Sequence, residues 1–323
     1  MNFILKIREK IFEQGLFGQA HASSLLRLAD GRYLAAWFAG TKEGALDVSI
    51  YGSIRNREGK WSTPIRWGRV REAPHWNPVL FQVPNGAVKL FFKVGNDCAN
   101  WETWVCQSND EGLSWDKPCE LVPGNKGGRG PVKNKPIILS DSSWLAPASL
   151  EDKNKWRVFA DRSRDAGIHW EASKEVPMNR KLINGQGVIQ PSLWESLPGH
   201  VHMLVRSSCS FICRSDSNDY GATWSELELT KLPNNNSGID LDKAPDGTLL
   251  LAYNRVSKDW GPRTPLNLAV SQDNGSSWED LCELETAPGE YSYPAVRVTP
   301  EGFAGTYTWK RDSIAFWEAK FNA

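Results

Sequence analysis

The chain has 323 residues, and its 38 lysines and arginines balance 38 aspartates and glutamates. A net charge of zero argues against an extended nucleic-acid footprint or a membrane-surface patch. No apolar run approaches the roughly 20 residues that span a bilayer, and the six cysteines lack the paired spacing of a zinc site. We therefore assign no nucleic-acid or membrane partner, no metal site and no cofactor.

The N-terminal segment, MNFILKIREKIFEQG, mixes charged and apolar residues. Because Lys6, Arg8, Glu9 and Lys10 interrupt its apolar stretch, it lacks the hydrophobic core of a signal peptide. We expect a cytoplasmic protein whose cysteines are buried free thiols. Residues 3–7 of this segment are instead a candidate β-strand.

Six turn-plus-strand segments follow along the chain, about one repeat apart. Each begins with a Gly or Ser turn and continues with alternating or nearly continuous apolar residues, which is typical of a β-hairpin. The segments cover residues 29–38, 84–94, 140–149, 197–207, 245–254 and 300–309.

Four copies of an octapeptide, Ser-x-Asp-x-Gly-x-x-Trp, lie between these segments at residues 108–115, 163–170, 217–224 and 271–278. Their starts are 55, 54 and 54 residues apart, a period that indicates repeated supersecondary units. The Asp and Ser side chains can hydrogen-bond amides inside a tight turn, and the Trp can pack the turn onto the sheet. We assign Asp110, Asp165, Asp219 and Asp273 structural roles.

Six units of about 54 residues, each with four short strands, predict an all-β, six-bladed β-propeller. Residues 55–61 resemble a degenerate first octapeptide, one period before Ser108. The N-terminal strand at residues 3–7 would complete the last blade and remove an exposed edge. Two stacked sandwiches do not explain the unbroken period, so residues 1–323 are expected to form one domain.

Strand order places the octapeptides on one face of the propeller and the functional residues on the other. Starts of first strands and second-to-third loops converge near the axis, and we expect the site there. First strands contribute His21, His75, Asn77, Lys133, Lys135, Gln190, Asp240, Tyr291 and Tyr293; loops contribute Lys42, Glu43, Asp47, Trp101, Glu102, Glu151, Arg206, Arg263, Lys310 and Arg311. This set carries more cations than anions, which suits a substrate with a carboxylate.

With these repeats, the chain resembles the sialidase (neuraminidase) superfamily over essentially its whole length. Sialidases carry the same octapeptide, called the Asp box, on a six-bladed propeller. The resemblance implies three arginines that bind the substrate carboxylate, a Tyr nucleophile assisted by a Glu, and an Asp acid/base.

By this resemblance, Arg206 and Arg263 match the middle and last arginines, and Tyr291 matches the nucleophile. Glu43 or Asp47 falls in the acid/base loop, with Glu43 the stronger candidate. His21 stands where the first arginine is expected, and His75 on the neighbouring strand is a further catalytic candidate. Gln190 replaces the Glu that assists the tyrosine. Residues assigned to substrate binding are Arg206, Arg263, Gln190, Lys42, Asn77, Trp101, Lys135, Tyr293 and Arg311.

Three functions remain open at this point. The first is a sialidase-like glycoside hydrolase acting on an acidic oligosaccharide or glycoconjugate. The second is a polysaccharide lyase, in which the arginines neutralise a uronate carboxylate and His21, His75 or a Tyr removes the adjacent proton. The third is a sugar-binding propeller without catalysis.

Overall fold

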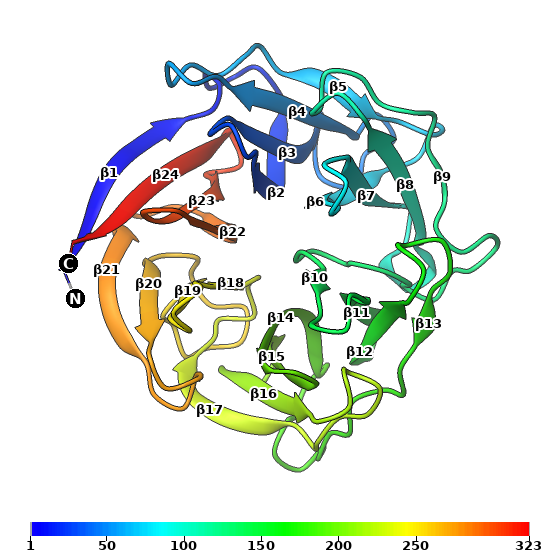
Figure 1. Cartoon of the computed structure of the whole chain (residues 1–323), viewed down its shortest axis with the longest axis vertical. Coiled ribbons are helices and arrows are strands. Elements are labelled where there is room, and N and C mark those ends of the chain that lie inside the picture. Colours follow the sequence, from blue (N-terminus) through cyan, green and yellow to red (C-terminus); the bar gives the residue numbers. More distant parts are fainter. Residues whose placement is uncertain (1, 323) are drawn as a thin grey trace.

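Residues 2–322 form six four-stranded antiparallel sheets that are arranged around a central axis as a β-propeller (Figure 1). The structure is a computed structural model that describes the backbone of residues 2–322 and the side chains of residues 4–320. The predicted six-bladed all-β propeller is confirmed. The first and last residues of the predicted 1–323 domain lie outside the described part of the chain.

Each blade runs from an inner strand at the axis to an outer strand at the rim (Figure 1). Blade 1 consists of β2 (Gln19–Arg27), β3 (Tyr33–Gly40), β4 (Ser49–Arg55) and β5 (Ile65–Gly68). Blade 2 consists of β6 (His75–Gln82), β7 (Val88–Val94), β8 (Glu102–Ser108) and β9 (Cys119–Glu120). Blade 3 consists of β10 (Ile137–Ile138), β11 (Trp144–Asp152), β12 (Lys155–Ser163) and β13 (Glu171–Ala172). Blade 4 consists of β14 (Val188–Leu197), β15 (His200–Ser207), β16 (Phe211–Ser217) and β17 (Glu228–Pro233). Blade 5 consists of β18 (Asp240–Lys243), β19 (Leu249–Tyr253), β20 (Leu266–Ser271) and β21 (Glu279–Glu285). Blade 6 consists of β22 (Tyr291–Thr299), β23 (Gly302–Trp309), β24 (Ser313–Asn322) and β1 (Asn2–Lys10). A 3₁₀ turn, η1 (Cys98–Asn100), precedes β8, and among the described residues no helix has the length and apolar character of a membrane span.

The N-terminal strand closes the ring. β1 pairs antiparallel with β24 along its whole length, from Asn2 opposite Asn322 to Lys10 opposite Ala315. This confirms the predicted closure by residues 3–7. Because the first and last strands of the chain share one sheet, the last blade keeps no unpaired edge on the β24 side.

The four octapeptides occupy the third-to-fourth strand turns, as predicted. In the first, Ser108 Oγ accepts a 2.7 Å hydrogen bond from the Gly112 amide, and Asp110 Oδ1 accepts bonds of 2.8 Å from Ser108 Oγ and the Ser114 amide. Equivalent bonds recur in the other three copies. The third strand of each blade ends on one face of the propeller, and the first strand begins on the other face. The repeats therefore lie on the face away from the starts of the first strands and have a structural role.

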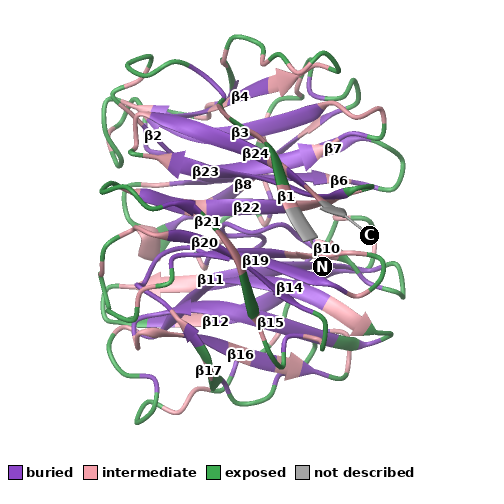
Figure 2. Ribbon diagram, turned by 90° about the vertical axis from the view of Figure 1, so that its left-hand side faces the viewer, coloured by how far each residue is buried: buried purple, intermediate pink, exposed green. Residues whose placement is uncertain are grey.

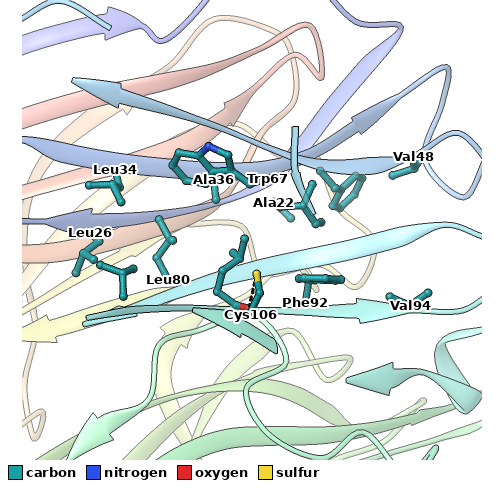
Figure 3. Close-up of a cluster of buried hydrophobic side chains, with 14 of the residues drawn as sticks. Ala22, Leu26, Leu34, Ala36, Val48, Trp67, Leu80, Phe92, Val94 and Cys106 are labelled. Atoms are coloured by element: carbon teal, nitrogen blue, oxygen red, sulfur yellow. Dashed lines mark hydrogen bonds between the residues drawn. The ribbon is translucent and has the colours of Figure 1, made fainter. Parts of the chain in front are cut away.

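The hydrophobic core lies between neighbouring blades. Figure 2 shows buried strands throughout the disc, with exposed residues mainly in the turns at its two faces. Between blades 1 and 2, Leu34 and Ala36 of β3 pack with Leu80 of β6 and Phe92 of β7 (Figure 3). The second strand of each blade is buried along nearly its whole length, which explains apolar runs such as those of β3, β7 and β19.

Long cationic side chains tie the inner strands together at the axis. Lys135 Nζ lies 3.1 Å from Asp240 Oδ2 and donates to the carbonyls of Leu241 and Val296 at 2.6 and 2.9 Å. Arg297 donates to carbonyls in β2 and β6. Lys135, predicted to bind substrate, is therefore fully engaged inside the scaffold.

Candidate active site

Four inner strands are interrupted near their starts. Each has a shift of pairing register where one residue adopts a left-handed backbone: Ala22 (φ 55°), Asn77 (φ 44°), Gln190 (φ 57°) and Tyr293 (φ 50°). Proline follows the last three, which removes a ladder donor. Left-handed non-glycine residues cost energy and cluster at functional sites. These bulges direct attention to the axial face of blades 1, 2, 4 and 6.

Arg206, at the end of β15, is the centre of a buried hydrogen-bonded group, called here the Arg206 group, which also contains Gln190, Tyr293 and Asn236. Its Nη1 donates to the phenol oxygen of Tyr293 at 2.7 Å and to Oε1 of Gln190 at 3.2 Å. Nε2 of Gln190 lies 3.4 Å from the same phenol oxygen. Arg206 is only 3 % exposed. In such a site a guanidinium stabilises negative charge that develops on the phenol oxygen.

The rest of the Arg206 guanidinium is held from blades 3 and 5. Nε donates to Asn236 Oδ1 at 2.8 Å, and Asn236 in turn donates to Asp259 at 2.8 Å. The rings of Trp156 and Trp260 lie 5.5 and 5.8 Å from Cζ. Within the described chain, Nη2 makes no hydrogen bond and Arg206 forms no ion pair. Nη2 is thus the donor of this guanidinium that a ligand would bind.

Arg263 and Arg311 share the carboxylate of Glu290. Nη1 of Arg263 lies 2.6 Å from Oε1, and Nε of Arg311 lies 2.9 Å from Oε2. Burial disfavours the ionised form of Glu290, but the two arginines outweigh it and lower its pKa. Arg311 also contacts Glu43 Oε2 at 2.5 Å. Glu43, the predicted acid/base, is therefore held as an ion-pair partner of Arg311.

Tyr293 lies close to two guanidinium groups. Its ring centroid is 5.7 Å from Cζ of Arg206 and 5.5 Å from Cζ of Arg263. Gly238 packs against it closely: a Cβ there would approach the Tyr293 ring to 3.3 Å and Gln190 Oε1 to 3.4 Å. Tyr293 is consequently the tyrosine that the fold brings to the arginines.

His21 lies beside Tyr293 and is buried. The two ring centroids are 4.3 Å apart, and Nδ1 is 2.8 Å from the Thr308 hydroxyl. Burial, and then the charges of Arg311, Arg263 and Arg206, lower its pKa well below the ordinary value. At pH 7 the ring is therefore neutral and can accept a hydrogen bond, whereas an arginine at this position would be a cation.

His75 and Tyr291 occupy equivalent places, two residues before the bulge in β6 and β22. His75 is bonded by the backbone on all sides: Nδ1 lies 3.0 and 2.8 Å from the carbonyls of Val48 and Ala73, and Nε2 accepts from the Val70 amide. Tyr291 is buried in the apolar cluster of blades 5 and 6. Neither residue contacts the Arg206 group, in contrast to what their predicted roles require.

The loop after β3 contributes less than predicted. Asp47 Oδ2 accepts bonds from the Thr41 amide and hydroxyl at 2.8 and 2.6 Å, so it closes the turn. Its pKa is lowered chiefly by the Thr41 hydroxyl, which is unfavourable for a general acid. Lys42 is exposed, with no side-chain bond to the described residues.

Two further candidates lie in blade 2. Trp101 is buried and packs on Trp76 with ring centroids 5.7 Å apart, so it is a packing residue in this conformation. Asn77 is buried at the bulge that corresponds to Gln190 and Tyr293. Its side chain makes no hydrogen bond within the described residues.

The sequence analysis did not identify Glu290, Asn236 or Thr308, each of which contacts an arginine or His21. Two signals pointed to this region. The Asn-Asn-Asn run at residues 234–236 is unusual for a buried segment, and Pro recurs after Asn77, Gln190 and Tyr293. The recurrent Pro marks the bulges that carry the site.

A separate groove of about 770 Å³ lies between the outer parts of blades 4 and 5. It is lined by residues of β16, β17 and the fourth Asp box, including Arg214 and Trp278. It contains no member of the Arg206 group. The perturbed and strained residues described above are at the axis, which makes the axial cluster the candidate site.

Comparison with known proteins finds a matching family model and solved structures of similar fold. A family model described as BNR repeat-like domain matches residues 31–305. Similar solved structures include a protein of unknown function from Dyadobacter fermentans DSM 18053, with a TM-score of 0.82 and 16 % identity over 99 % of this chain and 100 % of that chain. The NanB sialidase from Streptococcus pneumoniae has a TM-score of 0.74 and 14 % identity, covering 97 % of this chain and 70 % of that chain. Trypanosoma rangeli sialidase in complex with sialic acid has a TM-score of 0.73 and 15 % identity, covering 99 % and 59 %. No curated protein matches by sequence.

These identities establish a shared fold and leave chemistry to the site itself. Two of these structural neighbours are sialidases. The axial cluster adds two guanidinium groups around one phenol, a neutral imidazole and several carboxylates.

Proposed function

The chain belongs to the BNR repeat-like domain family, and from its fold and axial cluster we propose that it is a glycoside hydrolase acting on an acidic glycan. The observation that carries this proposal is that the guanidinium groups of Arg206 and Arg263 both lie within 6 Å of the Tyr293 ring. Nη2 of each arginine makes no hydrogen bond within the described residues. Guanidinium groups bind carboxylates through such donors.

In this proposal Arg206 and Arg263 hold the substrate carboxylate beside the phenol oxygen of Tyr293. The sialic acid bound by Trypanosoma rangeli sialidase is a carboxylate-bearing sugar, which supports the same class of substrate. Tyr293, rather than Tyr291, is the nucleophile. Because the Gln190 amide cannot accept the phenol proton, we assign that role to the neutral ring of His21.

A polysaccharide lyase is the second candidate. The neutral His21 beside Tyr293, together with Gln190 in place of an acid, would suit removal of a carbon-bound proton next to a neutralised carboxylate. A lyase leaves an unsaturated uronate that absorbs in the ultraviolet, and a hydrolase does not.

The test uses purified protein with sialosides and uronate-containing oligosaccharides, following released sugar and ultraviolet absorbance. We expect release of an acidic sugar without new absorbance, and no release when the carboxylate is converted to an amide. New absorbance would favour the lyase. Binding of acidic glycans without any product would favour the sugar-binding propeller.

Arg206→Ala should abolish turnover without a fall in melting temperature, since it also removes a buried cation that has no carboxylate partner. The matched control is Arg214→Ala in the same blade. Arg214 bonds Asp216 and the Asn274 carbonyl at 2.9 Å, so its loss should lower stability and leave turnover intact. Equal losses of turnover and stability in Arg206→Ala would contradict a binding role.

A further inference from the structure

Glu151 is a carboxyl group next to the Arg206 group that the mechanism above does not use. It lies near the end of β11 and pairs with Trp156 of β12. Directly paired residues project to the same side of a sheet, and the Trp156 ring lies 5.5 Å from Cζ of Arg206. Glu151 therefore faces the side of blade 3 that borders Arg206.

One hydroxyl links Glu151 to the bulge in blade 4. Ser149 Oγ donates to Glu151 Oε1 at 3.4 Å and lies at the same distance from the backbone amide of Gln190. Gln190 in turn bonds Arg206 and approaches the phenol oxygen of Tyr293. Glu151 is thus connected to the phenol of Tyr293 through two residues, Ser149 and Gln190.

The carboxyl groups of the cluster differ in their partners. Glu43 and Glu290 are ion-paired with Arg311, and Glu290 also with Arg263. Glu151 forms no ion pair with any described residue. Burial raises its pKa, although Arg206, Lys93 and hydrogen bonds from Ser149 and Gln190 oppose the shift. Glu151 thus lacks the ion pairs that the other two form, and its burial favours the protonated form that a proton donor requires.

Resting on the proposed function, we propose that Glu151 is the proton donor to the leaving group. The Tyr293 oxygen bonds to the anomeric carbon, and its proton passes to the ring of His21. The bond from that carbon to the glycosidic oxygen breaks, its electron pair stays on the oxygen, and the oxygen takes the Glu151 proton.

Water then completes the reaction. Its oxygen bonds to the anomeric carbon while one of its protons passes to the Glu151 carboxylate. The bond to Tyr293 breaks, and the phenol oxygen recovers its proton from His21. Glu151 returns to its protonated form, so both residues are ready for the next cycle.

The test compares Glu151→Gln with the matched variant Glu43→Gln on two substrates that share one acidic sugar. One substrate has a nitrophenol leaving group, which departs without protonation, and the other has a sugar alcohol. Glu151→Gln should lose about 10²- to 10⁴-fold in kcat on the sugar alcohol and much less on the nitrophenol. The alkaline limb of its kcat–pH profile should also disappear.

Glu43→Gln should lose activity equally on both substrates, because it acts through Arg311. An equal loss in Glu151→Gln, or no loss, would overturn the assignment of Glu151. If the wild-type protein cleaves no acidic glycoside, the proposed function fails and infrared difference spectra still decide about Glu151. The wild-type spectrum should contain a band of a protonated carboxyl group that is absent from the spectrum of Glu151→Gln. This band should persist at pH values above the ordinary Glu pKa of about 4.3, and its loss in the ordinary pH range would overturn the proposal.

Discussion

Nη1 of Arg206 donates a 2.7 Å hydrogen bond to the phenol oxygen of Tyr293, whereas the hydroxyl of Tyr291, two residues earlier in β22, bonds no described residue. The two tyrosines form a matched pair on one strand. Tyr293→Phe should lower kcat by at least about 10³-fold, because it removes the nucleophilic oxygen.

Tyr291→Phe should retain activity and change the free energy of unfolding by less than about 1 kcal/mol. Steady-state kinetics and urea denaturation of both variants provide the measurement. Loss of activity in Tyr291→Phe with retention in Tyr293→Phe would restore the sequence-based assignment of Tyr291.

The bulges explain why spacing alone could not show which of these two tyrosines contacts Arg206. In a regular strand, residues two apart share one face, so Tyr291 and Tyr293 are indistinguishable by spacing. The register shift between Ser292 and Ala295 separates them. His75 and Asn77 are separated in the same way. A local break in pairing depends on contacts between blades and leaves only an indirect trace, the recurrent Pro.

The fold itself was predictable, because the Asp boxes repeat with a nearly constant period and their recurring Ser and Asp side chains bond within their own turns. The position of Arg206 and Arg263 near the axis was also predictable, since a loop position follows directly from blade order. Partners were not. Nothing in the sequence indicates that Glu290 bridges Arg263 and Arg311, which are separated by 48 positions along the chain.

The buried pair of Lys135 and Asp240 should contribute to stability and not to substrate binding. Asp240→Asn leaves the lysine without a carboxylate and should lower the free energy of unfolding by about 3–5 kcal/mol. The double variant Lys135→Met/Asp240→Asn should lose less than the sum of the single losses, because the two residues interact directly. Urea denaturation measures all three. A Lys135→Met protein of normal stability with a raised KM would support substrate binding instead.

His75 predicts a loss of stability in mild acid. Burial is the main cause that lowers its pKa in the folded protein to about 4, against about 6.5 when unfolded. Between these values the unfolded chain binds a proton that the folded chain excludes, so stability falls as pH drops from about 6.5 to about 4. The fall is at most about 3 kcal/mol.

His75→Gln should be less stable at neutral pH, since it loses bonds to the Val48 and Ala73 carbonyls, but its stability should depend less on pH. The exposed His200 provides the control: His200→Gln should keep the wild-type dependence. Denaturant unfolding at a series of pH values is the measurement. An unchanged slope in His75→Gln would show that other groups cause the acid sensitivity.

Cys209 should be an unusually reactive thiol. It lies in the turn after Arg206, with its Sγ 3.8 Å from Sγ of Cys213. The hydrogen bond from Cys213 is the main cause that lowers the pKa of Cys209 to about 6, whereas burial raises the pKa of Cys98, Cys106 and Cys282. At pH 7 the thiolate form of Cys209 should dominate, and thiolates are the species that alkylating reagents attack.

Limited treatment with iodoacetamide and peptide mass spectrometry should therefore find Cys209 modified before those three thiols. Cys213→Ala removes the donor and should slow the modification of Cys209, while Cys282→Ala, the control, should leave it unchanged. The modification of Cys209 should also slow as pH falls below about 6, because its thiolate is then protonated. Equal modification rates of Cys209 in the wild-type and Cys213→Ala proteins would contradict the effect of the Cys213 hydrogen bond on the Cys209 thiol.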